Sequence, residues 1–230
     1  MTRVARSHNP FEPLSPASLA RVYDWPGEAL RFLAGEFDCL HVVGDFGMGK
    51  TTLLRQIERR LAADGATVLY ACVPLGGRLD LALSPDLSVA LIDETDRLPR
   101  RALADLLGRL YAARCRCALA GHRRQLREIR RAGFTAEYLE LKPIAAQETL
   151  RAIFERRTAL VFGAGEDAPR LTPGAARALL RASRGNIERS VQIGYEVFED
   201  LRAVREITAL DVEAAAVSLD RALGGGGASR

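Results

Sequence analysis

The stretch that decides the fold is Gly44-Asp45-Phe46-Gly47-Met48-Gly49-Lys50-Thr51, a turn rich in glycine. It follows residues 38–44, an apolar segment with the character of a buried strand. It precedes residues 50–61, where apolar side chains recur at helical spacing. In such a unit the glycines let the backbone curl so that its N–H groups face one point, and the helix adds its positive end. The stretch therefore predicts a phosphate-binding loop at the end of a strand.

Each polar position of the loop has an expected role. Lys50 is expected to reach the β- and γ-phosphates of ATP, and the hydroxyl of Thr51 is expected to bind Mg²⁺. The predicted cofactors are therefore ATP and magnesium. The nucleotide-binding residues predicted from this loop are Gly44, Gly47, Met48, Gly49, Lys50, Thr51 and Thr52.

Two acids follow a second apolar segment, residues 88–92. Asp93, at the expected end of a strand, is predicted to share the magnesium site with Thr51. Glu94 is placed to polarise an attacking water as a general base. Together with the phosphate loop, the pair favours nucleotide hydrolysis over nucleotide binding alone.

Strand and helix patterns alternate through the first two thirds of the chain. Apolar runs predict strands at residues 38–44, 67–73, 88–93, 115–120 and 136–141. Helical patterns lie between them, at residues 50–61, 100–113 and 122–132. Such alternation predicts a three-layer α/β sandwich around a parallel five-stranded sheet.

The pattern becomes entirely helical after Lys142-Pro143, with helices expected at residues 145–160, 173–182, 187–201 and 209–222. We divide the chain into an N-terminal arm with a short helix (1–35), a nucleotide-binding core (36–144), a helical lid (145–223) and a flexible tail (224–230).

Composition and charge limit the class of protein. Of 230 residues, 48% are hydrophobic and 27% are charged, which is typical of a globular protein. No apolar run approaches the length of a membrane span, and no secretory signal is visible, so a cytoplasmic location is expected. The net charge of +4 is uneven, because residues 97–131 hold eleven arginines and only two acids. This segment suits an anionic partner.

The phosphate loop, Asp93-Glu94, a polar residue after the fourth strand and the helical lid together resemble an AAA+ ATPase. The resemblance covers essentially the whole chain. Asn9-Pro10-Phe11, Tyr23 and Glu28-Ala29-Leu30 resemble one group, which contains the TniB/TnsC-type transposition regulators and the ExeA/GspA ATPases. The transposition members use ATP to assemble on DNA and to license a transposase.

The resemblance implies further site residues. His122 stands where a polar residue senses the γ-phosphate. Arg131, or alternatively Arg130, stands where such ATPases send an arginine into the neighbouring subunit. In the lid, Arg189 is the candidate nucleotide sensor, although alignment on Gly185-Asn186 puts Glu188 at that place and leaves both possible.

The basic segment supplies candidate DNA contacts. Several arginines on the helix expected at residues 122–132 recur at spacings of three and four, and others lie just beyond Asp93-Glu94, in a loop that often faces the channel of AAA+ rings. Such arginines would neutralise phosphates without reading sequence. The candidates are Arg97, Arg100, Arg101, Arg123 and Arg127.

The sequence thus predicts an ATP-hydrolysing assembly switch that oligomerises with ATP, on double-stranded DNA, to regulate a DNA-processing partner such as a transposase. The main alternative is a regulatory or scaffolding AAA+ ATPase that acts on a protein partner without binding DNA. A small P-loop kinase is a third possibility, which the helical lid disfavours.

Overall fold

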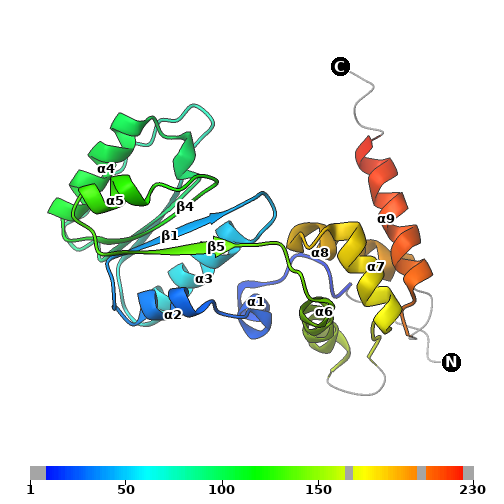
Figure 1. The fold of residues 1–230 in the computed structure, drawn as a ribbon. Coiled ribbons are helices and arrows are strands. Elements are labelled where there is room, and N and C mark those ends of the chain that lie inside the picture. The colour runs from blue at the N-terminus through cyan, green and yellow to red at the C-terminus, as the bar shows by residue number, and fades with distance from the viewer. Residues whose placement is uncertain (1–8, 164–167, 201–205, 225–230) are drawn as a thin grey trace. The chain divides into compact units, whose positions relative to one another are not determined.

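A computed structural model describes residues 9–163, 168–200 and 206–224 of the chain. Its first half is built on a parallel sheet with the strand order β2-β3-β4-β1-β5 (Figure 1). The predicted five-stranded parallel sheet is therefore confirmed. The strands are β1 (Cys39–Gly44), β2 (Val68–Cys72), β3 (Val89–Asp93), β4 (Arg116–Gly121) and β5 (Ala136–Leu141).

The register of the central strands brings their carboxyl ends to one edge of the sheet. In β1 and β4, Val43 lies opposite Gly121, and in β3 and β4, Ile92 lies opposite Leu119. All five residues of β3 are buried, as expected for a strand covered on both faces. Polar residues that follow β1, β3 and β4 therefore gather at the same edge.

Helices cover both faces of the sheet and complete the three layers (Figure 1). On one face lie α2 (Gly27–Leu33) and α3 (Lys50–Ala63), and on the other lie α4 (Arg100–Ala112) and α5 (Leu126–Arg131). A short 3₁₀ helix, η1 (Thr95–Arg97), links β3 to α4. The leucines of α4 recur at helical spacing and are all buried in the core, namely Leu103, Leu106, Leu107 and Leu110.

The chain divides into two compact units. The α/β unit spans Asp24–Lys142, and the helical unit combines the residues up to Tyr23 with those from Pro143 onward. Residues 1–35, predicted as one segment, are therefore shared between the units. The reason is burial, because Phe32 of α2 is enclosed in the α/β unit, whereas Phe11 packs in the core of the helical unit.

The helical unit contains the predicted lid helices, each within two residues of its expected bounds. They are α6 (Gln147–Phe162), α7 (Pro173–Ser183), α8 (Ile187–Asp200) and α9 (Ala209–Gly224), preceded by α1 (Pro16–Val22). The hydroxyl of Thr172 accepts a hydrogen bond from the N–H of Ala175, which caps α7. The predicted tail lies outside the described residues except for Gly224, which ends α9. No described helix has both the length and the apolar character needed to span a bilayer.

The segment Asn9-Pro10-Phe11 is anchored inside the helical unit. The ring of Phe11 lies 4.8 Å from that of Phe154, and a Cβ on Gly194 would meet it at 2.6 Å. The buried guanidinium of Arg157 donates hydrogen bonds to the carbonyls of Pro10, at 3.1 Å, and Glu12, at 2.9 Å. Burial lowers the pKa of Arg157 to about 10. The arm is thus held by ring packing and by one buried cation.

Candidate functional site

The loop between β1 and α3 needs glycine at three positions. Gly47 and Gly49 have φ angles of 75° and 89°, a region that favours glycine. A Cβ on Gly44 would lie 2.7 Å from the carbonyl oxygen of Leu141, which is closer than a real contact allows. Helix α3 begins at Lys50, and no side chain among the described residues caps its N-terminus. Its first N–H groups are therefore left for another acceptor.

Lys50 is the buried cation of this loop. Only 5% of the residue is exposed, and its ammonium donates to the carbonyls of Gly44, at 2.6 Å, and Asp45, at 2.9 Å. Burial lowers the pKa of Lys50, while the nearby carboxylates of Glu94 and Asp93 oppose that shift. Of the other predicted loop residues, Met48 is buried and Thr52 is half-buried on the first turn of α3.

Thr51 and Asp93, the two residues predicted to bind Mg²⁺, lie within hydrogen-bond distance of each other. The Thr51 hydroxyl donates to Asp93 Oδ2 at 2.6 Å, and Asp93 is 1% exposed. The same Oδ2 accepts a second hydrogen bond, at 3.0 Å, from the hydroxyl of Tyr70 on β2. The N–H of Glu94 donates to Oδ1 at 2.9 Å. Three donors therefore fix the orientation of this carboxylate.

Glu94 lies at a bend directly after β3. Its backbone adopts the left-handed conformation, with φ of 59°, which is uncommon for residues other than glycine. Its carboxylate is 3.2 Å from Nη2 of Arg97 and 3.8 Å from Nε2 of His122. The structure therefore brings Glu94 and His122 together at the edge where Lys50, Thr51 and Asp93 also lie.

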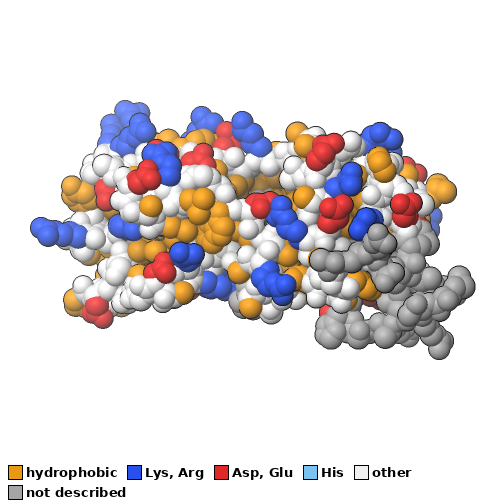
Figure 2. All heavy atoms as spheres, turned by 90° about the horizontal axis from the view of Figure 1, so that it is seen from below, with side chains coloured by type: hydrophobic (Ala, Val, Ile, Leu, Met, Phe, Trp, Pro, Cys, Tyr) orange, Lys and Arg blue, Asp and Glu red, His pale blue; other side chains and the backbone are white. Residues whose placement is uncertain are grey.

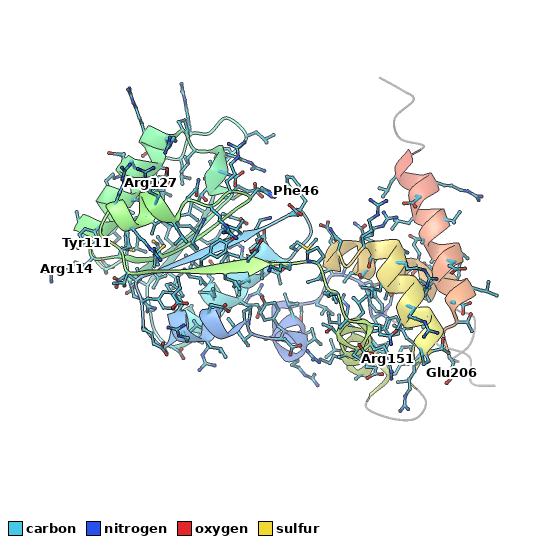
Figure 3. All side chains as sticks on the ribbon, viewed as in Figure 1. Phe46, Tyr111, Arg114, Arg127, Arg151 and Glu206 are labelled. Atoms are coloured by element: carbon cyan, nitrogen blue, oxygen red, sulfur yellow. The ribbon has the colours of Figure 1, made fainter. Side chains whose placement is uncertain are left out.

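The His122 ring also faces the loop after β1. Its centroid lies 4.1 Å from the ring of Phe46, which is 72% exposed (Figure 3). Nε2 of His122 is buried and has no hydrogen-bond partner among the described residues. The imidazole is thus available to a group bound between the loop and Glu94.

A second layer of polar residues, not predicted from the sequence, ties the end of β4 to the segment after β3. The N–H of His122 donates to Asp96 Oδ1 at 2.8 Å, and the N–H of Gln125 donates to Nε2 of the buried His41 at 2.9 Å. The Thr95 hydroxyl lies 2.8 Å from Gln125 Oε1. A Cβ on Gly121 would meet Asp96 Oδ1 at 2.4 Å, so glycine is required for this approach.

These contacts correct the predicted helix at residues 122–132. Its start was wrong, because the hydrogen bonds of His122 and Gln125 hold the preceding segment outside a helix, and α5 begins at Leu126. Arg123 therefore precedes the helix and shares no helical face with Arg127, Arg130 and Arg131. Figure 3 places Arg127 on α5.

The remaining basic candidates differ in their surroundings. Arg97, predicted as a DNA contact, is instead held within the unit, because it pairs with Glu94 and its Nη1 donates to the carbonyl of Val73 at 2.8 Å. Arg100 pairs with Glu128 at 2.8 Å and keeps 81% of its side chain exposed. Arg101 and Arg123 are exposed, and their side chains make no hydrogen bond or ion pair with a described residue.

Arg130 and Arg131, the two candidates for an arginine acting on a neighbouring subunit, end α5. Both are exposed, and within the described part of the chain neither side chain has a hydrogen-bond or ion-pair partner. On the face drawn in Figure 2, by contrast, Lys and Arg side chains are interspersed with Asp and Glu.

In the helical unit, Arg189 bonds within its own unit. Its Nε donates to the carbonyl of Ala182 at 2.9 Å and its Nη2 to Asp220 at 2.6 Å. Glu188 is exposed on the first turn of α8. Arg189 is therefore the more constrained of the two sensor candidates.

Among the described residues, Glu94, Asp96 and His122 each place one ligand atom within 4.8 Å of the others. This group borders the pair predicted to bind magnesium, Thr51 and Asp93. These groups already have partners, since Asp96 accepts a hydrogen bond from the His122 N–H and Glu94 pairs with Arg97.

Two solved structures resemble the chain over most of its length. A mutant of RuvB from Thermotoga maritima matches 89% of this chain and 69% of its own, with 21% identity and a TM-score of 0.58. NtrX from Brucella abortus, solved in complex with ADP, matches 88% of this chain and 57% of its own length, with 14% identity and a TM-score of 0.53. The chain has the AAA+ fold. No protein-family model and no curated protein sequence matches it.

Proposed function

We propose that the chain is an ATP-binding and ATP-hydrolysing assembly switch of the AAA+ type. One observation carries the proposal: Thr51 on the phosphate-type loop contacts Asp93 on β3 at 2.6 Å, with Glu94 beside them. A loop that only turned the chain would need neither the buried Lys50 nor a buried acid aimed at its first helical turn.

ATP fits the donors at this edge. The free N–H groups at the start of α3 and the ammonium of Lys50 would bind the phosphates, which would replace the loop carbonyls as partners of Lys50. Thr51 donates its proton to Asp93, so lone pairs of its oxygen remain for a metal ion. Hydroxyl and carboxylate oxygens are ligands that Mg²⁺ prefers. When bound there, Mg²⁺ would offset charge on the β- and γ-phosphates.

Glu94 is the proposed general base, orienting a water for attack on the γ-phosphate. Arg97 holds its carboxylate, and Nε2 of His122, which has no hydrogen-bond partner among the described residues, lies 3.8 Å from it. His122 is accordingly the proposed sensor of the γ-phosphate. Arg189 or Glu188 is the proposed lid sensor.

Oligomerisation is proposed because, within the described part of the α/β unit, the site holds no arginine free to stabilise the transferred phosphoryl group. Arg97, the arginine beside the proposed base, is paired with Glu94. Arg131, or alternatively Arg130, is exposed at the end of α5, and its side chain has no partner among the described residues of its own chain. Either can serve as a finger in a neighbouring subunit's site, so ATP would favour assembly.

Double-stranded DNA is the proposed anionic partner in the cytoplasm. Arg101, Arg123 and Arg127 are exposed, and Arg100 is held only by one exposed ion pair, which contributes little. Regulation of a transposase or similar DNA-processing protein rests on the resemblance of residues 9–30 to the transposition group.

Light scattering of the purified protein tests this proposal. The protein is measured with ADP and with a slowly hydrolysed ATP analogue, each with and without random duplex DNA, and Lys50→Ala is the control. The expected result is an increase in particle mass that requires both the analogue and DNA. Growth with the analogue alone would point to a protein partner without DNA, and a monomer under all conditions would contradict the switch.

A further inference from the structure

Tyr70 lies beside Asp93, one of the two proposed magnesium ligands, although it belongs to no recognised sequence motif. In the parallel pair of β2 and β3, Cys72 lies opposite Asp93 and Tyr70 opposite Leu91. Side chains two residues apart on a strand share a face, so Tyr70 is the diagonal neighbour of Asp93. Its long side chain spans that diagonal, and its hydroxyl reaches Asp93 Oδ2 at 3.0 Å.

The proton positions in this group follow from the hydrogen bonds. Asp93 Oδ2 receives both the Thr51 and the Tyr70 hydroxyls, so both must donate. Tyr70 thereby occupies one direction of Oδ2 and leaves the lone pairs of Thr51 free.

The ring of Tyr70 is itself held from α3. The guanidinium carbon of Arg55 lies 3.3 Å from the ring centroid, and Arg55 also pairs with Glu58 at 2.8 Å. Thr51 and Arg55 are four residues apart, on the same face of α3. One helix face thus supplies both the hydroxyl that shares Asp93 and the cation that covers Tyr70.

We infer that Tyr70 is a positioning residue for the magnesium site: it orients the Asp93 carboxylate, and Arg55 holds its ring in place. The inference rests on the proposed function, because it needs Thr51 and Asp93 to bind Mg²⁺ with a nucleotide. Partners that orient a metal ligand typically change metal affinity by about 10- to 100-fold when removed. Among the described residues, the Tyr70 hydroxyl bonds to Asp93 and not to the loop that would hold the phosphates, so its loss should not affect metal-free nucleotide binding.

The test compares nucleotide affinity with and without metal. A fluorescent ADP is titrated with the full chain in excess MgCl₂ and again in excess EDTA, and the ratio of the two dissociation constants measures the contribution of the metal. Tyr70→Phe removes a single oxygen atom and should lower this ratio by about 10-fold, with the EDTA value unchanged within about 2-fold.

Tyr138→Phe is the matched control. Tyr138 lies on β5 and its hydroxyl accepts a hydrogen bond from Arg124, so the same atom is removed away from Asp93. Arg55→Met removes the partly exposed cation that covers the ring and should reduce the ratio in the same direction by a smaller factor. It keeps the inference testable if Tyr70→Phe does not fold.

The outcomes separate two failures. If the unaltered protein binds ADP more tightly with Mg²⁺ and Tyr70→Phe gives the same ratio as Tyr138→Phe, the inference is wrong and the proposed function stands. Equal loss of affinity in EDTA and in MgCl₂ would also overturn it, because Tyr70 would then act on the fold or on the phosphates. If the unaltered protein binds no nucleotide, the proposed function fails and the inference fails with it.

Discussion

At the edge of the sheet in the α/β unit, the buried side chains of Asp93 and Thr95 bond to other side chains, whereas the buried polar side chains described in the helical unit bond to backbone groups. At the edge of the sheet, Asp93 receives Thr51 and Tyr70, and Thr95 meets Gln125. In the helical unit, by contrast, Arg157 donates to the carbonyls of Pro10 and Glu12, and buried Thr158 and Ser190 donate to carbonyls of the residues Glu155 and Asn186 that precede them.

The two kinds of contact should differ in whether their loss affects function or stability. Side chains that bond to one another can exchange partners when a ligand arrives, because no backbone has to move. Arg157, by contrast, cannot be removed without leaving the carbonyls of Pro10 and Glu12 unpaired, which costs free energy. Substitutions in the first set should therefore change function more than stability, and substitutions in the second set should do the reverse.

Glu94→Gln should give the largest effect. The amide keeps the size of the side chain but cannot accept a proton, so we expect hydrolysis to slow by about 10²- to 10⁴-fold. ATP affinity and thermal stability should stay near those of the unaltered protein. Steady-state phosphate release measures the rate, with Glu36→Gln, an exposed acid paired with Arg31, as the control. Near-normal turnover in Glu94→Gln would remove it from the role of base.

Lys50→Ala should lower nucleotide affinity by about 100-fold, because it removes charged hydrogen bonds to the phosphates. The chain contains only one other lysine, Lys142, which is exposed, and Lys142→Ala is therefore the natural control. Isothermal titration with ATP measures the difference. Equal affinity in the two variants would contradict the assignment of the loop.

Arg157→Met should act in the opposite sense, on stability alone. It leaves the carbonyls of Pro10 and Glu12 without their buried donor, and we expect a loss of about 2 kcal/mol in the free energy of unfolding. Chemical denaturation measures this loss, and ADP affinity should be unchanged. The exposed pair Arg181–Glu213 provides the control, since Arg181→Met should cost less than about 1 kcal/mol. A large loss of nucleotide affinity in Arg157→Met would break the contrast between the units.

The parts of the fold predicted correctly are those that local sequence determines. The turn between β1 and α3 follows from glycines at fixed spacing, and the positive φ angles at Gly47 and Gly49 show why glycine is needed there. The lid helices follow from caps and periodicity, as at Thr172. Asp93 could be paired with Thr51 because both lie at the ends of elements that meet at one edge.

The rest of the site depends on register and on contacts between distant segments. Tyr70 is one aromatic residue in an apolar run, and only the pairing of β2 with β3 brings it to Asp93. The start of α5 was wrong because arginine spacing suits a helix from His122, while the bond of His122 to Asp96 prevents one. The local sequence shows an additional acid, Asp96, two residues after Glu94, but it does not show that this acid bonds to His122.

Reversing the charge of Arg123 and Arg127 should give the smallest effect per residue, and it extends the contrast to the surface. If these exposed side chains neutralise DNA phosphates, Arg123→Glu with Arg127→Glu should weaken binding to random duplex about equally for all sequences. The dependence of log affinity on log salt should lose about two units of slope, one for each lost contact. Fluorescence anisotropy at several salt concentrations, in the presence of the ATP analogue, measures both quantities.

The matched control reverses the charge of two exposed arginines of the helical unit, Arg177 and Arg181, so that the net charge changes by the same amount. Equal losses of DNA affinity in both double variants would mean that DNA binding depends on overall charge alone. The segment after β4 would then not be the DNA-binding surface.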